Sequence, residues 1–71
     1  MRETYSRMVK EYEEAINIVS QRISKRRAEL KGLPPYGKRT GILRSEIAVL
    51  YEERREAMDA AKILREYAEA N

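Results

Sequence analysis

The sequence predicts an all-α protein, an antiparallel two-helix hairpin of coiled-coil type that dimerises into a four-helix bundle. First, both prolines and two of the three glycines fall within residues 32–37, which marks one central turn. Second, residues 2–31 and 42–71 contain neither glycine nor proline and are rich in helix-favouring residues. Third, apolar residues recur in both flanks at alternating steps of three and four. We therefore expect one helical-hairpin domain over residues 1–71.

The first helix is expected at about residues 2–32, followed by a loop at 33–38. Gly32 suits the end of a helix, and the pair Pro34 and Pro35 prevents its continuation. One side of this helix carries a heptad seam with a single arginine in it. The seam consists of Tyr5, Val9, Tyr12, Ile16, Val19, Ile23, Arg26 and Leu30.

The second helix is expected at about residues 39–70, with two alternatives for its start. Thr40 is of a type that caps helix N-termini, whereas Pro35 is of a type that occupies the first helical position. This helix carries the same spacing, again with one arginine. Its seam consists of Leu43, Ile47, Leu50, Arg54, Ala57, Ala61, Leu64 and Ala68.

The two seams mirror each other about a point between Tyr36 and Gly37. Folding the chain there pairs every seam residue with one of the other seam, for example Tyr12 with Ala61 and Ile23 with Leu50. Large residues then face small ones, as interdigitating helices require. The turn signals and the seam spacing, which are independent, thus predict the same hairpin.

Arg26 and Arg54 interrupt the seams and allow two interpretations. Guanidinium groups in a bundle can bind phosphate or carboxylate ligands. We favour a structural role, in which the methylenes lie on the seam and the charges meet Glu46 and Glu53 beside it.

The seams leave many apolar residues outside the hairpin core. A chain of 71 residues without cysteine has no disulfides to compensate for a small core, so oligomerisation is the expected stabilising device. We expect a homodimer that forms through the apolar flanks of the helices. A different protein could also bind to these flanks. The expected interface residues are Ile18, Ile42, Val49, Tyr51, Met58, Ile63 and Tyr67. In length, hairpin symmetry and heptads the chain resembles the small helical hairpins that dimerise into four-helix bundles, such as the plasmid RNA-binding regulator Rop.

Charge divides the chain into a basic loop end and an acidic open end. Residues 20–45 hold eight cations and one carboxylate, whereas the remaining residues hold seven cations and eleven carboxylates. A basic tip with an aromatic ring suits the phosphates and bases of a nucleic acid. The residues of this expected nucleic-acid site are Arg22, Lys25, Arg27, Lys31, Tyr36, Lys38, Arg39 and Arg44.

Enzymatic chemistry has little support in the sequence. Cysteine and histidine are absent, which excludes thiol and imidazole catalysis as well as zinc-finger sites. The pairs Glu11-x-x-Glu14 and Glu56-x-x-Asp59 resemble the magnesium-binding pairs of all-helical nucleoside triphosphate pyrophosphatases, but their separation is too long, and Glu14 and Asp59 point outward in the predicted register. We therefore predict no catalytic residue, no cofactor and no metal.

These observations predict a small non-enzymatic interaction or assembly module, with a nucleic-acid-binding regulator as the alternative. No apolar run exceeds the five residues 47–51 and the first residues lack the layout of a signal peptide, so we expect no membrane association and a cytoplasmic location.

The loop sequence Leu33-Pro34-Pro35-Tyr36 matches short peptides that WW domains bind. We favour a rigid connection in which Tyr36 packs over the end of the bundle.

Overall fold

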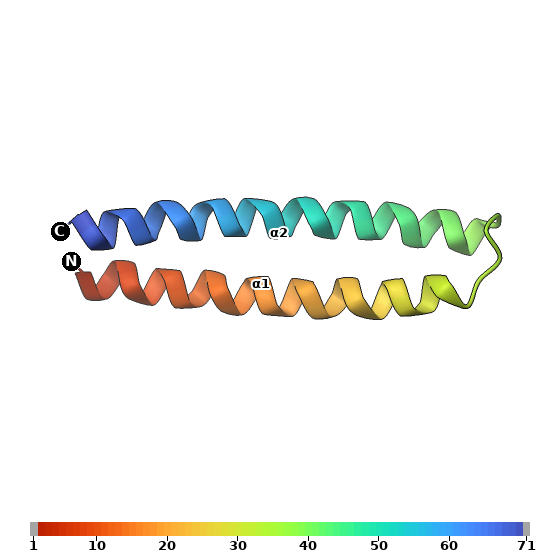
Figure 1. Ribbon diagram of the computed structural model, residues 1–71, viewed down its shortest axis with the longest axis horizontal. Coiled ribbons are helices and arrows are strands. Elements are labelled where there is room, and N and C mark those ends of the chain that lie inside the picture. Colours follow the sequence, from red (N-terminus) through yellow and green to blue (C-terminus); the bar gives the residue numbers. More distant parts are fainter. Residues whose placement is uncertain (1, 71) are drawn as a thin grey trace.

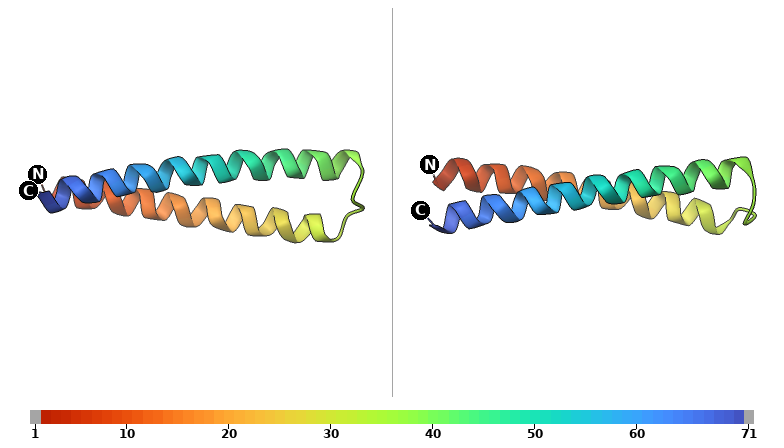
Figure 2. Two further views of the ribbon diagram at one scale, coloured as in Figure 1. Left: turned by 45° about the horizontal axis from the view of Figure 1, so that its top comes forward. Right: turned by 90° about the horizontal axis from the view of Figure 1, so that it is seen from above.

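The protein is a hairpin of two long helices that lie side by side in antiparallel orientation (Figure 1). The computed structural model describes residues 2–70, so residues 1 and 71 of the expected domain lie outside the described residues. Helix α1 spans Arg2–Lys31 and helix α2 spans Lys38–Ala70. The Cα atoms extend over 52 × 14 × 11 Å, and the two helices cross at a shallow angle (Figure 2). This is the expected all-α hairpin, with the packing geometry of a coiled coil.

The predicted seams form the contact between the two helices. The five buried apolar residues within 2–70 are Val9, Ile23, Leu43, Leu50 and Ala61, and all five are seam positions. The other seam residues are half-buried, apart from Tyr12, which is 36% exposed. Burial thus follows the three-and-four spacing along both helices, which confirms that the two predicted seams face each other.

Helix α1 ends one residue earlier than expected. The amide of Gly32 donates to the carbonyl of Glu29 and that of Leu33 to the carbonyl of Leu30, both at 3.1 Å. These bonds span three residues instead of four, so they tighten the last turn and satisfy two carbonyls at the helix end. Gly32 therefore closes the helix, as predicted.

Helix α2 begins at Lys38, one residue before the predicted bound near residue 39, and neither Pro35 as its first residue nor Thr40 as its cap is observed. Gly37 occupies the cap position, because its carbonyl accepts the first helical hydrogen bond, from the amide of Gly41 at 3.1 Å. Its φ angle of 156° lies in the region that side chains rarely adopt. Only glycine adopts this conformation without strain, so the cap of α2 lies at Gly37 and not at Thr40.

Thr40 instead ties the loop to the start of α2. Its side chain is only 3% exposed and lies one heptad before Ile47, so it extends the seam toward the loop. The hydroxyl donates to the carbonyl oxygen of Pro34 at 2.7 Å. The buried polar group thus has a partner, and the loop is fixed against the first turn of α2.

Within residues 2–70, neither helix combines the length and the apolar character that crossing a membrane requires.

Candidate functional site

The cross-helix contacts divide the hairpin surface into two broad faces. On one side of the seam, the Arg26 Nε atom lies 2.9 Å from Glu46 Oε2, and the rings of Tyr5 and Tyr67 are 6.0 Å apart. Arg39 binds Glu29 on the same side through two guanidinium nitrogens, the shorter contact being 2.7 Å. With Val9 of α1 and Arg54 of α2 taken as a positions of the heptad, each of these contacts involves a residue at a g position.

The opposite side of the seam is closed by a second set of contacts. The Arg65 Nη2 atom lies 3.2 Å from Glu13 Oε1. Arg27 donates from Nη1 to the hydroxyl of Tyr51 at 3.1 Å. These four residues occupy e positions, which face each other across an antiparallel pair just as g positions do on the other side. The hairpin is therefore a layer with two distinguishable faces.

The first face, which we call the apolar face, carries six exposed large apolar residues. Their exposed fractions range from 38% at Met8 to 57% at Val49. They lie at c and g positions of the heptad, where charged residues such as Glu11, Arg22 and Glu56 separate them. The apolar face consists of Met8, Ile18, Ile42, Val49, Ile63 and Tyr67.

The predicted interface residues do not all share this face. Five of them belong to the apolar face, whereas Tyr51 and Met58, which are 37% and 51% exposed, lie on the opposite side beside Arg27 and Arg65. A single partner seated on one face leaves the other two residues uncovered. The heptad spacing of the sequence already places Tyr51 and Met58 on the flank of the second helix opposite to that of Val49 and Ile63.

The second face, which we call the arginine face, is built around Tyr51. The guanidinium carbon of Arg54 lies 4.8 Å from the centre of the Tyr51 ring, a cation–π contact, and Arg54 also donates to the Ser20 hydroxyl at 3.4 Å. Arg55 lines the same hollow as Tyr51 and Arg54. Arg44 lies two turns before Tyr51 on the same side of α2. The arginine face consists of Arg27, Arg44, Tyr51, Arg54 and Arg55.

The two seam arginines thus have different environments. Arg26 meets Glu46, as predicted. The predicted partner of Arg54, Glu53, is not among its contacts, because Arg54 turns to the other side of the seam and covers the ring of Tyr51. Neither arginine is left buried without a hydrogen-bond partner.

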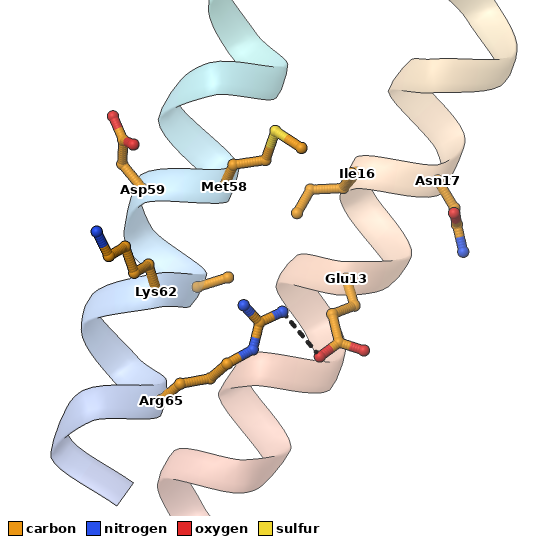
Figure 3. Close-up of a pocket in the computed structure, with 8 residues that line it drawn as sticks. Glu13, Ile16, Asn17, Met58, Asp59, Lys62 and Arg65 are labelled. Carbon is orange, nitrogen blue, oxygen red and sulfur yellow. Dashed lines mark hydrogen bonds and ion pairs between the residues drawn. The ribbon is translucent and has the colours of Figure 1, made fainter. Parts of the chain in front are cut away.

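A groove of about 590 Å³ opens between the helices in the open half of the arginine side (Figure 3). Ile16 and Met58 form part of its wall, and Ala61 forms its floor because an alanine side chain leaves space where a leucine would fill it. Glu13 and Arg65 neutralise each other, and Asp59 points away from the groove. Asn17 and Lys62 also line the groove.

The residues of the expected nucleic-acid site lie around the loop end, but they are spread over both faces of the hairpin and the helix ends. Arg27 and Arg44 belong to the arginine face, whereas Arg39 is bound to Glu29 on the apolar side. Arg22 and Lys25 occupy g and c positions on that same apolar side, and Lys31 and Lys38 are the last residue of α1 and the first of α2. Sequence reasoning missed Arg54 and Arg55, because one was assigned to the seam and the other lies outside the basic segment. Their shared flank with Tyr51 is the signal that identifies them.

Tyr36 does not pack over the end of the hairpin. Its side chain is 89% exposed, so the prediction of a packing role is wrong. The loop is held instead by Gly37 and by the hydrogen bond from Thr40 to Pro34.

The described part of the chain contains no group of three or more acidic side chains arranged to hold a metal ion. No protein-family model, curated protein or solved structure matches the chain.

Proposed function

We propose that the protein is an assembly module that self-associates through the apolar face, with two hairpins forming a four-helix bundle. The observation that carries this proposal is the set of exposed apolar side chains on one face of the hairpin, namely Met8, Ile18, Ile42, Val49 and Ile63; Tyr67 on the same face lies against Tyr5. Contiguous apolar surface of this extent is characteristic of interfaces, whereas isolated exposed apolar residues are ordinary. Packing a second layer on this face converts a two-helix layer into the usual helical bundle.

The small core of the hairpin supports the same proposal. Five apolar residues among the described ones are buried, and one of them is an alanine. Small chains without disulfides or structural metals gain the missing stability by oligomerising. A second copy would bury the six residues of the apolar face and more than double the number of buried apolar side chains.

The charges beside the apolar face make a second copy a suitable occupant. Along α1, Glu11 and Ala15 lie on one side of the midpoint between Ile16 and Asn17, and Ile18 and Arg22 lie at the mirrored positions. A two-fold axis there places Glu11 of one copy against Arg22 of the other, and Ala15 against Ile18. An interface of this kind is isologous, so each pair occurs twice.

Helix α2 fits the same axis. Val49 and Ile63 lie at equal distances on either side of Glu56, and Glu56 is level with Asn17, next to the midpoint on α1, because Ile16 and Ala57 are paired across the seam. The axis therefore brings Val49 of one copy against Ile63 of the other. It also places the two loops at opposite ends, so that the basic loop end of each hairpin lies over the acidic open end of its partner.

The experiment is sedimentation equilibrium of the wild-type protein and of a matched pair of variants. Ile63 and Met58 are both 51% exposed but lie on opposite faces. Ile63→Asp should shift the protein to a monomer with reduced helicity at low concentration, whereas Met58→Asp should leave the dimer intact. A wild-type protein that stays a compact monomer over a wide concentration range would rule out the proposal.

A charge exchange tests the axis without altering the apolar residues. Glu11→Arg and Arg22→Glu should each weaken the dimer, and the double variant should restore it. Because exposed ion pairs contribute about 0.2–1 kcal/mol each and the pair occurs twice, each single variant should raise the dissociation constant roughly 2- to 30-fold. Equal weakening by the single and double variants would contradict this axis while leaving self-association itself in place.

A further inference from the structure

The arginine face concentrates positive charge without paired carboxylates. The three ion pairs found within residues 2–70 involve Arg26, Arg39 and Arg65. None of the four arginines of the arginine face is among them. Two carboxylates, Glu52 and Asp59, line the hollow that Tyr51, Arg54 and Arg55 share, and neither is within ion-pair distance of an arginine. Within the described residues, Arg27 and Arg54 bond only to hydroxyl groups, so these guanidinium groups keep donors for an external anion.

Tyr51 is held in position at the centre of this face. Its hydroxyl accepts a hydrogen bond from Arg27 on α1, while the guanidinium carbon of Arg54 lies over one face of the ring, 4.8 Å from its centre. The side chain is nevertheless 37% exposed. An exposed ring held by two neighbouring cations loses little freedom when a planar group stacks on it.

The spacing of the cations along α2 suits an extended polyanion. Arg44 and Arg55 are eleven residues apart, which corresponds to roughly 16 Å along a helix at 1.5 Å per residue. Tyr51 and Arg54 lie between them, and Arg27 reaches the same strip from α1. A linear array of positive groups around an aromatic ring is the arrangement by which proteins bind single strands.

We infer that the arginine face binds the phosphate backbone of a single-stranded nucleic acid, with one base stacked on Tyr51. A duplex offers the same phosphates but keeps its base faces stacked internally, so the exposed ring favours a single strand. This site differs from a basic hairpin tip, because it includes Arg54 and Arg55 and excludes Arg22, Lys25, Lys38 and Arg39. It goes beyond the proposed assembly function, and self-association through the apolar face would leave it exposed on both sides of the bundle.

Fluorescence anisotropy with labelled single-stranded RNA and DNA, and with duplexes of the same length, tests the inference. Arg44→Gln with Arg55→Gln removes two charges from the arginine face, and Arg7→Gln with Lys38→Gln removes two charges elsewhere. The slope of log affinity against log salt changes by about 0.7 per phosphate contact for a single strand. The face variant should therefore flatten this slope by about 1.4, and the control should change it much less.

Tyr51 provides an independent readout. Tyr51→Ala should weaken single-strand binding roughly 5- to 150-fold, the equivalent of one stacked base, with little change in salt slope. Tyr51→Phe keeps the ring and loses only the bond to Arg27, so it should retain most of the affinity. Duplexes should be nearly insensitive to both substitutions.

Three outcomes would overturn the inference. The first is the absence of any RNA or DNA binding by the wild-type protein at about 50 mM salt, where electrostatic binding is strong. The second is equal loss in the face variant and the control, which would indicate unspecific attraction to net charge. The third is tighter binding of duplexes than of single strands. Sedimentation of the same variants shows whether self-association is intact, so failure of this site is distinguishable from failure of the proposed assembly.

Discussion

The loop half and the open half of the hairpin are packed differently. Next to the loop, Ile23, Leu43 and Leu50 are buried, with Leu43 only 1% exposed. In the open half the α2 seam consists mainly of alanines, and Tyr12 opposite Ala61 remains 36% exposed. The groove beside Ala61 and Ile16 reflects the same shortage of volume. Stability in this hairpin should therefore be concentrated near the loop.

The largest expected effect comes from truncating the loop half. Leu43→Ala removes the most completely buried large side chain and should lower the free energy of unfolding by about 2–5 kcal/mol. Leu64→Ala makes the same change at a half-buried seam position of the open half and should cost clearly less. Urea unfolding of both variants at one protein concentration gives the comparison. Equal losses would show that the two halves are equally stable.

The next effect concerns the cap of α2. Gly37→Ala forces an alanine to a φ angle of 156°, although space for its Cβ atom is open. The cost should be backbone strain alone, about 1–3 kcal/mol. Gly41→Ala is the control, because Gly41 lies inside α2 with open space around it and alanine favours helices. Thermal unfolding should show a lower midpoint for the first variant and an equal or higher one for the second.

A smaller effect is expected from the bond that fixes the loop. Thr40→Val keeps the shape of the buried side chain but removes the donor to the Pro34 carbonyl. The loss should be about 1 kcal/mol, because the exposed Pro34 segment can hydrate its carbonyl. Thr40→Ser keeps the hydroxyl and removes only a methyl group, so its unfolding midpoint shows how much of the effect is packing. A loss confined to the serine variant would contradict a role for the hydrogen bond.

The smallest effect is expected from the exposed ion pairs. Glu29→Gln near the loop and Glu13→Gln in the open half each break one pair with an arginine. Exposed pairs of this kind contribute about 0–1 kcal/mol, less at high salt, so both variants should unfold almost like the wild type. A large and unequal loss of stability in the two variants would show that the halves differ in stability because of electrostatics and not because of packing.

Much of this architecture is predictable from sequence because it depends on periodic features. The alternation from Tyr5 to Leu30 and from Leu43 to Ala68 determines both the seam and its pairing, and Gly32 with the two prolines places the turn. The start of α2 was not predictable, since Thr40 and Gly37 both suit a cap and only the loop geometry decides between them. The grouping of Arg54 and Arg55 with Tyr51 was not predicted, because the direction in which Arg54 turns from the seam depends on Tyr51 and Ser20.

The pairing of the seams has a consequence for how the chain folds. Leu30 and Leu43 are close in sequence and can meet as soon as the loop of residues 32–37 closes, whereas Tyr5 and Tyr67 can meet only across nearly the whole chain. Each pair formed shortens the loop that the next pair must close. The contacts between the helices should therefore form first next to Gly37 and last near the ends of the hairpin. In the native state, local unfolding should begin at those ends and reach the loop half last.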